Sequence, residues 1–156
     1  MRAIHVIVLC TFAMAAAIAD DDHMHHAPSA AGPVPGLGEI MSLQLMRHAK
    51  LWLAGSQKNW PLADYELDEL REGFEDMRKF HQTHEGVPVG AMVQSLTPAP
   101  LEALGKAIAA KDAAGFAKSF DQLTGACNTC HRAAKRGFIV ITRPASSPFP
   151  NQKFAP

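Results

Sequence analysis

Five residues near the end of the chain could carry specific chemistry, because residues 127–131 read CNTCH. The pattern C-x-x-C-H is typical of covalent c-type haem attachment. Two thiols at i and i+3 can each form a thioether with a vinyl group on one porphyrin edge, and the histidine that follows can bind the iron. The pattern predicts Cys127 and Cys130 as the anchors of one haem c and His131 as its proximal iron ligand.

Two other sites use closely spaced cysteines. A redox C-x-x-C pair normally opens a helix in a βαβ context, and a structural zinc site takes a second pair of Cys or His ligands. The sequence predicts neither setting around Cys127 and Cys130. The third cysteine of the chain, Cys10, lies in an apolar segment that we expect to be removed. These observations favour haem over both alternatives.

The first residues predict export. Arg2 precedes an apolar run over residues 3–18, and the sequence AIA at residues 17–19 stands before three aspartates, as at a signal-peptidase site. The run is too short for a comfortable membrane span. We expect a signal peptide over residues 1–19, cleaved after Ala19, and a periplasmic protein. Residues 20–36 mix charge, proline and glycine without apolar periodicity, which predicts a disordered leader.

The apolar spacing over residues 37–137 predicts four helices. The first runs from Leu37 to Gly55, and the second follows Asn59 as its N-cap and reaches His84. A loop over residues 85–100 follows, in which Thr97 caps a third helix, and a fourth runs from Asp112 to Gly137. Short connections between such helices predict an all-α domain, an antiparallel up-down-up-down four-helix bundle.

Residues 138–156 are rich in proline and predict a non-helical C-terminal arm. The apolar stretch 138–141 within it is expected to pack back on the bundle near the haem. A dimer contact or a docking strap is the alternative.

A C-x-x-C-H motif near the C-terminal end of a four-helix bundle resembles the cytochrome c′, or class II cytochrome c, family over residues 37–137. The resemblance implies that Cys127 and Cys130 hold the haem and that His131 binds the iron, with Lys135 as a basic residue beside the proximal face. It also implies that a homodimer through the first two helices is an option. The proline-rich tail departs from the family pattern.

The distal side of the iron decides the function. In such a bundle the fourth helix ends where the first begins, so a distal ligand should come from the start of the first helix or the end of the second. Met41 lies there on an apolar face, and the resemblance implies a methionine ligand from this part of the helix in low-spin members. His48 lies about 10 Å deeper and is expected to be a hydrogen-bonded core residue. Ligation by His81 or His84, or an open site, remains an alternative.

Two functional classes follow from these alternatives. With Met41 on the iron, the protein is a low-spin one-electron carrier. With an open distal site, it is a protein that binds or detoxifies a gas such as NO or CO. No further pairing of a nucleophile with a base predicts an enzyme.

The charge distribution bears on the partners. The net charge is zero, but basic residues predominate after residue 100. Arg132, Lys135, Arg136 and Arg143 are expected to cluster at the haem end and to attract an acidic redox partner protein. No run of lysine and arginine with interleaved aromatic residues predicts nucleic-acid binding.

Overall fold

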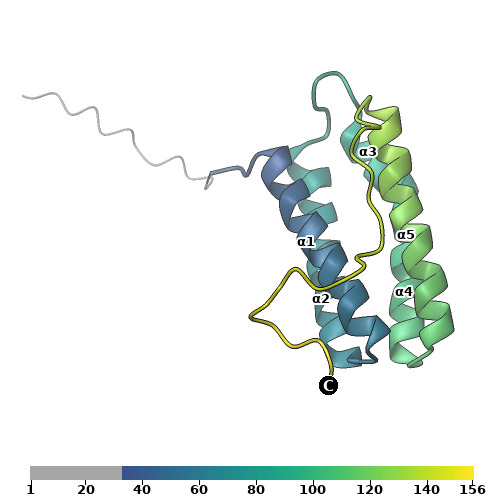
Figure 1. Cartoon of the computed structure of the whole chain (residues 1–156). Helices are drawn as coiled ribbons and strands as arrows, with labels where there is room; N and C mark the ends of the chain where they lie inside the picture. Colours follow the sequence, from purple (N-terminus) through teal and green to yellow (C-terminus); the bar gives the residue numbers. More distant parts are fainter. Residues whose placement is uncertain (1–32) are drawn as a thin grey trace, which may run out of the picture. The chain divides into compact units, whose positions relative to one another are not determined.

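The computed structural model of the chain describes residues 33–156, whose regular secondary structure is helical (Figure 1). Five α-helices follow one another: α1 Leu37–Ser56, α2 Trp60–Phe80, α3 Val89–Leu96, α4 Pro98–Ala109 and α5 Ala113–Ala133. No β-strand forms within this range, and one isolated antiparallel bridge pairs His84 with Val87 between α2 and α3. The prediction of an all-α fold is therefore confirmed. The signal peptide predicted for residues 1–19 lies outside the described residues, as does most of the predicted leader.

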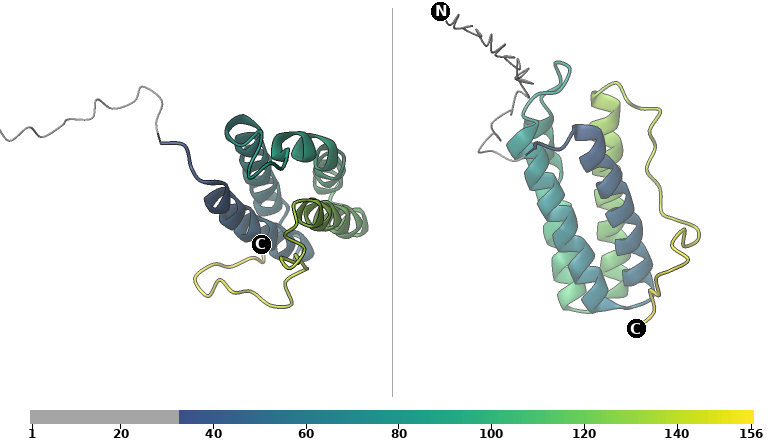
Figure 2. Two further views of the ribbon diagram at one scale, coloured as in Figure 1. Left: turned by 90° about the horizontal axis from the view of Figure 1, so that it is seen from above. Right: turned by 90° about the vertical axis from the view of Figure 1, so that its left-hand side faces the viewer.

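The four longer helices lie side by side in two pairs (Figure 2). α1 packs on α2 and α4 packs on α5, and the pairs are joined by contacts of α2 with α4 and of α1 with α5. The largest side chains that are fully buried between them are Leu51, Leu67, Leu70, Met77, Leu104, Phe116, Phe120 and Leu123. Each contributes about 1.5–3 kcal/mol to stability through the apolar surface that it removes from water. Within residues 33–156, no helix has both the length and the apolar composition that crossing a membrane requires.

Two of the predicted N-caps start helices in the structure. The Asn59 side chain accepts a hydrogen bond from the Leu62 amide at 3.4 Å, and Pro61 occupies the first turn of α2, where its missing N–H costs nothing. The Asp112 carboxylate accepts from the amides of Ala114 and Gly115 at 3.1 and 3.0 Å. Both caps satisfy amides that have no partner inside the helix.

The loop predicted for residues 85–100 is wrong, because α3 forms inside it. Val89 and Val93 lie one turn apart on this helix and are buried. The prolines that suggested a loop stand at helix starts instead: Pro88 is the N-cap of α3, and Pro98 opens α4. Thr97 is the N-cap of α4, as predicted, but its hydroxyl donates to the Val93 carbonyl at 2.9 Å instead of accepting from an amide of α4.

Two helix ends also differ from the prediction. α2 ends at Phe80 with His81 as its C-cap, so that His84 lies in the turn that follows. α5 ends at Ala133 rather than at Gly137, because the chain reverses at Lys135 with a φ of 58°. The motif residues 127–131 nevertheless lie in the last two turns of α5, as the sequence predicted.

The chain beyond α5 has no helix and returns along the molecule (Figure 1). It passes beside α5, where Arg143 pairs with Asp121 at 2.6 Å. It then reaches the opposite end, where Phe154 is buried and Asn59 donates to the Ala155 carbonyl at 3.4 Å. The predicted non-helical C-terminal arm is therefore present, and its far end packs on the helices. The packing predicted for the apolar stretch 138–141 is only partial, because Phe138, Ile139 and Val140 are exposed.

Candidate functional site

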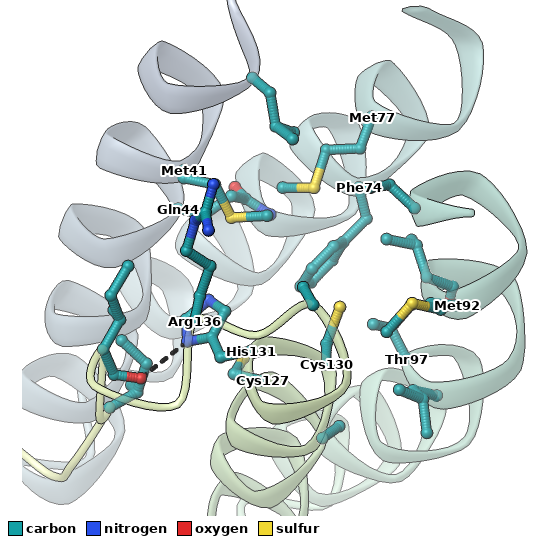
Figure 3. A pocket seen from close by; sticks show the side chains of 18 of the residues that line it. Met41, Gln44, Phe74, Met77, Met92, Thr97, Cys127, Cys130, His131 and Arg136 are labelled. Carbon is teal, nitrogen blue, oxygen red and sulfur yellow. Dashed lines mark hydrogen bonds between the residues drawn. The ribbon is translucent and has the colours of Figure 1, made fainter. Parts of the chain in front are cut away.

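The motif residues open onto one apolar pocket of about 430 Å³. α1, α2, α3, α5 and the start of the C-terminal arm all contribute to its walls. Cys127, Cys130 and His131 line it from α5, and Met41 lines it from α1 (Figure 3). The volume lies within the usual range of about 300–1,000 Å³ for cofactor and ligand pockets. The structure thus brings all four predicted site residues together.

Cys127 and Cys130 are free, half-buried thiols. Burial, followed by the charge of the neighbouring Cys130, raises the pKa of Cys127 from 9.0 to about 11, and burial also raises the pKa of Cys130. A redox C-x-x-C pair needs a thiol whose pKa is lowered, which a helix N-terminus favours. These thiols lie near a helix C-terminus, where the helix dipole disfavours a thiolate. They are poorly suited to disulfide exchange, whereas an apolar pocket in which both sulfurs meet a ligand edge suits covalent attachment.

The His131 ring is held by a single hydrogen bond. Its Nδ1 lies 3.0 Å from the carbonyl oxygen of Ile139 in the C-terminal arm (Figure 3). A carbonyl oxygen can only accept, so Nδ1 must carry the proton, and in the neutral ring Nε2 keeps its free electron pair. Histidines that bind metals commonly donate their other nitrogen to a backbone carbonyl in this way. The ring is thus prepared to bind a metal through Nε2.

Three methionines line the pocket from three different helices. Met41 on α1 is half-buried and packs against the core, Met77 on α2 is fully buried, and Met92 on α3 is half-buried. Figure 3 shows these side chains entering the pocket from α1, α2 and α3. Of these three methionines, only Met41 was predicted from the sequence to lie at the site. Met92 was not, although its apolar spacing with Val89 and Leu96 indicates a helix that faces the core.

The histidines weighed as rivals of Met41 have other partners or lie near the surface. His48 is buried and its Nε2 lies 2.9 Å from Thr124 Oγ1, which itself donates to the Phe120 carbonyl. Nε2 of His48 therefore donates and is not free to bind a metal, as expected for a core histidine. His81 Nε2 lies 2.9 Å from the Pro35 carbonyl, and His84 lines the pocket with a side chain that is 46 % exposed.

The basic residues expected at the haem end do not form one cluster. Arg136 lines the pocket and pairs with Glu85 at 2.5 Å, which joins the end of α5 to the turn after α2. Arg132 and Lys135 are exposed nearby on the chain. The placement predicted for Arg143 is wrong, because its guanidinium pairs with Asp121 and lies 4.2 Å from the Trp52 ring, away from the motif.

The donor set suits a haem better than a bare metal ion. Among the residues that the structure describes, no three His, Cys, Asp or Glu side chains converge as they would around zinc. In a haem the porphyrin supplies four nitrogen ligands to the iron, and the protein supplies the axial ligands and an apolar enclosure. His131 Nε2, the thioether of Met41 and the apolar walls of the pocket can supply these.

No family model, curated protein or solved structure matches this chain.

Proposed function

We propose that the protein is a c-type cytochrome that holds one covalent haem c in the pocket between α1, α2, α3 and α5. Cys127 and Cys130 form the thioethers, and His131 binds one side of the iron through Nε2. One observation carries the proposal: both thiols of the motif line the same apolar pocket as a His131 ring whose other nitrogen is already bonded to a backbone carbonyl.

The arrangement of the helices supports a bundle similar to that of class II cytochromes c. In this interpretation α3 and α4 together form the third rod, and α1, α2 and α5 form the other three, in the up-down-up-down order. Export to the periplasm depends on the signal peptide predicted for residues 1–19, and a homodimer through α1 and α2 remains part of the proposal.

Met41 is the proposed distal ligand, which would make the protein a low-spin one-electron carrier. The bound haem would supply an iron centre that changes its charge by one electron. The chain's own part is to exclude water with the apolar walls, to fix the His131 ring and to present the Met41 sulfur. Arg132 and Lys135, both exposed near the pocket, would face an acidic redox partner.

The same pocket supports a second candidate, a five-coordinate haem that binds a gas such as NO or CO. The observation that favours it is the predominantly apolar lining of the pocket, which includes Leu70, Phe74 and Val93 and suits an uncharged diatomic molecule. In that case Met41 packs beside the iron without binding it.

An absorption spectrum of the protein, expressed in a host that matures c-type cytochromes, tests the proposal. Covalent haem that resists acid extraction, together with a band near about 695 nm in the oxidised protein, is expected for His–Met ligation. The Met41→Ala variant should lose that band and become high-spin. Met46→Ala is the matched control, since Met46 lies on the same helix but does not line the pocket, and it should keep the band.

The outcomes separate the candidates. A high-spin wild-type spectrum with covalent haem would exclude the electron carrier and support the gas-binding protein. A colourless product with both thiols free would exclude a cytochrome of either kind.

A further inference from the structure

The chain turns back on itself directly after the motif. The amide of Arg136 donates to the His131 carbonyl at 2.7 Å, and the amide of Ile139 donates to the Arg136 carbonyl at 2.9 Å. These bonds redirect the chain after α5 and bring residues 138–143, here called the strap, alongside the last turns of α5. The turn thus places the Ile139 carbonyl 3.0 Å from His131 Nδ1.

Asn128 ties the strap to α5 with two hydrogen bonds. Its Nδ2 donates to the Ile141 carbonyl at 2.9 Å, and its Oδ1 accepts from the Ile141 amide at 2.8 Å. A side-chain amide that bonds both backbone groups of one residue satisfies them as a neighbouring strand would. Asn128 is the first of the two unspecified positions within C-x-x-C-H, so the motif itself contains the residue that fixes the strap.

Arg143 anchors the end of the strap. Its guanidinium binds both carboxylate oxygens of Asp121, at 2.7 and 2.6 Å, and donates to the Ala117 carbonyl at 3.0 Å. Such a two-pronged pair restricts geometry more than a single contact does. The Ile139 carbonyl is therefore held between the turn after α5 on one side and the bonds of Asn128 and Arg143 on the other.

The strap also forms part of the pocket wall. Ile139 and Ile141 line the pocket, and Ile139 is still 44 % exposed. Phe138 and Val140 do not line the pocket and are 78 % and 66 % exposed. The strap thus contributes apolar side chains and a carbonyl to the same side of the pocket as His131.

We propose that the strap is a positioning device for His131, in which Asn128 holds the segment and the Ile139 carbonyl selects the ring tautomer that leaves Nε2 free. A histidine free in water prefers the opposite tautomer, with the proton on Nε2. The use of this free Nε2 as an iron ligand rests on the proposed function. The tautomer of His131 is a property of the chain itself and can be measured without haem.

The test is NMR of the haem-free full chain, with its histidine rings labelled with ¹⁵N, at a pH of about 8.5 where an ordinary imidazole is neutral. The His131 shifts of the wild type should report a proton on Nδ1. Asn128→Ala should move the ring toward the Nε2–H tautomer, and Arg143→Gln should do so to a smaller extent. Thr129→Ala is the matched control, because Thr129 is a neighbour on α5 whose hydroxyl bonds the Gly125 carbonyl and Arg132 rather than the strap. It should leave the tautomer unchanged.

A proton on Nε2 of the wild-type ring would overturn the proposal, and so would an Nδ1–H tautomer that survives in Asn128→Ala. The helical circular dichroism signal shows whether a variant has lost only the strap or the whole fold. If Asn128→Ala unfolds, the tautomer of His131 is measured in Arg143→Gln, which changes an exposed residue.

The haem-loaded protein gives a second measurement. A carbonyl that accepts from Nδ1–H makes the imidazole a stronger donor to the metal. The reduction potential should therefore rise in Asn128→Ala and stay at the wild-type value in Thr129→Ala, and equal potentials in the three proteins would contradict the inference. A chain that takes up no haem would exclude the proposed function, whereas the tautomer measurement would still decide on the strap.

Discussion

The two histidines that line the pocket from α1 and α5 differ in what their ring nitrogens contact. His131 offers Nδ1 to a backbone carbonyl and keeps Nε2 free, whereas His48 uses Nε2 to donate to Thr124. His48 also stacks on Phe120, with 4.3 Å between ring centroids. The same residue type therefore serves as a candidate ligand in one wall of the pocket and as a core residue in another.

Burial of His48 predicts a pH dependence of stability. Desolvation lowers its pKa from 6.5 to about 4, so the unfolded chain takes up a proton at this ring more readily than the folded chain does. The resulting stabilisation is complete above pH 6.5 and is lost as the pH falls toward 4. Between pH 7 and pH 5 the free energy of unfolding should fall by about 2 kcal/mol because of this ring.

The variant His48→Gln, which keeps a donor for Thr124, should lack this part of the decline in urea denaturation at the two pH values. His84→Gln is the control, because the His84 side chain is 46 % exposed whereas His48 is buried, and this variant should follow the wild type. An equal decline in His48→Gln and the wild type would show that His48 does not carry the effect.

At the scale of the helices, apolar periodicity and N-cap residues predicted those features that depend on local chemistry alone. Asn59 and Asp112 start helices because a side-chain oxygen can satisfy free amides whatever the rest of the fold does. α3 was missed because prolines at 88, 98 and 100 looked like a loop. So short a helix is stabilised by the burial of Val89 and Val93 against the core, which its own sequence does not reveal. α2 ends before His84 because the backbone leaves the helical conformation at His81, where φ is −129° and ψ is 59°, and the ring of that residue bonds the Pro35 carbonyl.

The motif of the candidate site could be predicted from the sequence, but its surroundings could not. Cys127, Cys130 and His131 lie close together in the chain, so their spacing alone was sufficient to predict the motif. Met92 and Ile139 reach the pocket only through a helix and a chain reversal that the spacing did not reveal. The misplacement of Arg143 has a similar cause, because its partners Asp121 and Trp52 are distant in sequence.

The contact between α1 and α5 predicts the cost of a small substitution. Gly55 is buried near the end of α1, and a methyl group placed on it would lie 2.1 Å from the Phe116 ring. Phe116 is itself fully buried and cannot move without disturbing its neighbours. Gly55→Ala should therefore lower the free energy of unfolding by about 1–3 kcal/mol, as overpacking of a core does.

Gly125→Ala is the matched control on α5, where a methyl group would meet nothing within 4 Å. It should leave stability unchanged or raise it by up to about 1 kcal/mol, because alanine is the better helix former. Urea denaturation of both variants makes the comparison. A Gly55→Ala protein as stable as Gly125→Ala would mean that α1 and α5 are packed less closely than described here.

At the scale of the whole molecule, the C-terminal arm is fastened at two separate places. The strap is held near His131 by Asn128 and Arg143. The far end is held by Phe154, which is 4 % exposed, and by the hydrogen bond from Asn59 to the Ala155 carbonyl. Phe149 belongs to this far end, because its ring centroid lies 5.9 Å from that of Phe154 and 5.4 Å from the ammonium of Lys50. We expect the two ends of the arm to open independently, because few contacts hold the chain between them.

Phe154→Ala tests this independence. Loss of a buried phenylalanine costs about 3–5 kcal/mol in a core, but here the far end of the arm can detach while the helices stay folded, so the cost is limited to that local opening. Amide exchange at Gln152, whose N–H donates to the Phe149 carbonyl, should accelerate by about tenfold or more. Exchange at Ile141, whose amide is bonded by Asn128, should not change.

Phe138→Ala is the control for Phe154→Ala, because Phe138 is 78 % exposed, and exchange at Gln152 should stay at the wild-type rate. Equal acceleration at Gln152 and Ile141 in Phe154→Ala would mean that the arm opens as one unit. The orientation of His131 would then depend on an aromatic side chain buried at the opposite end of the molecule. Independent opening would instead leave the Ile139 carbonyl in place whenever the far end of the arm detaches.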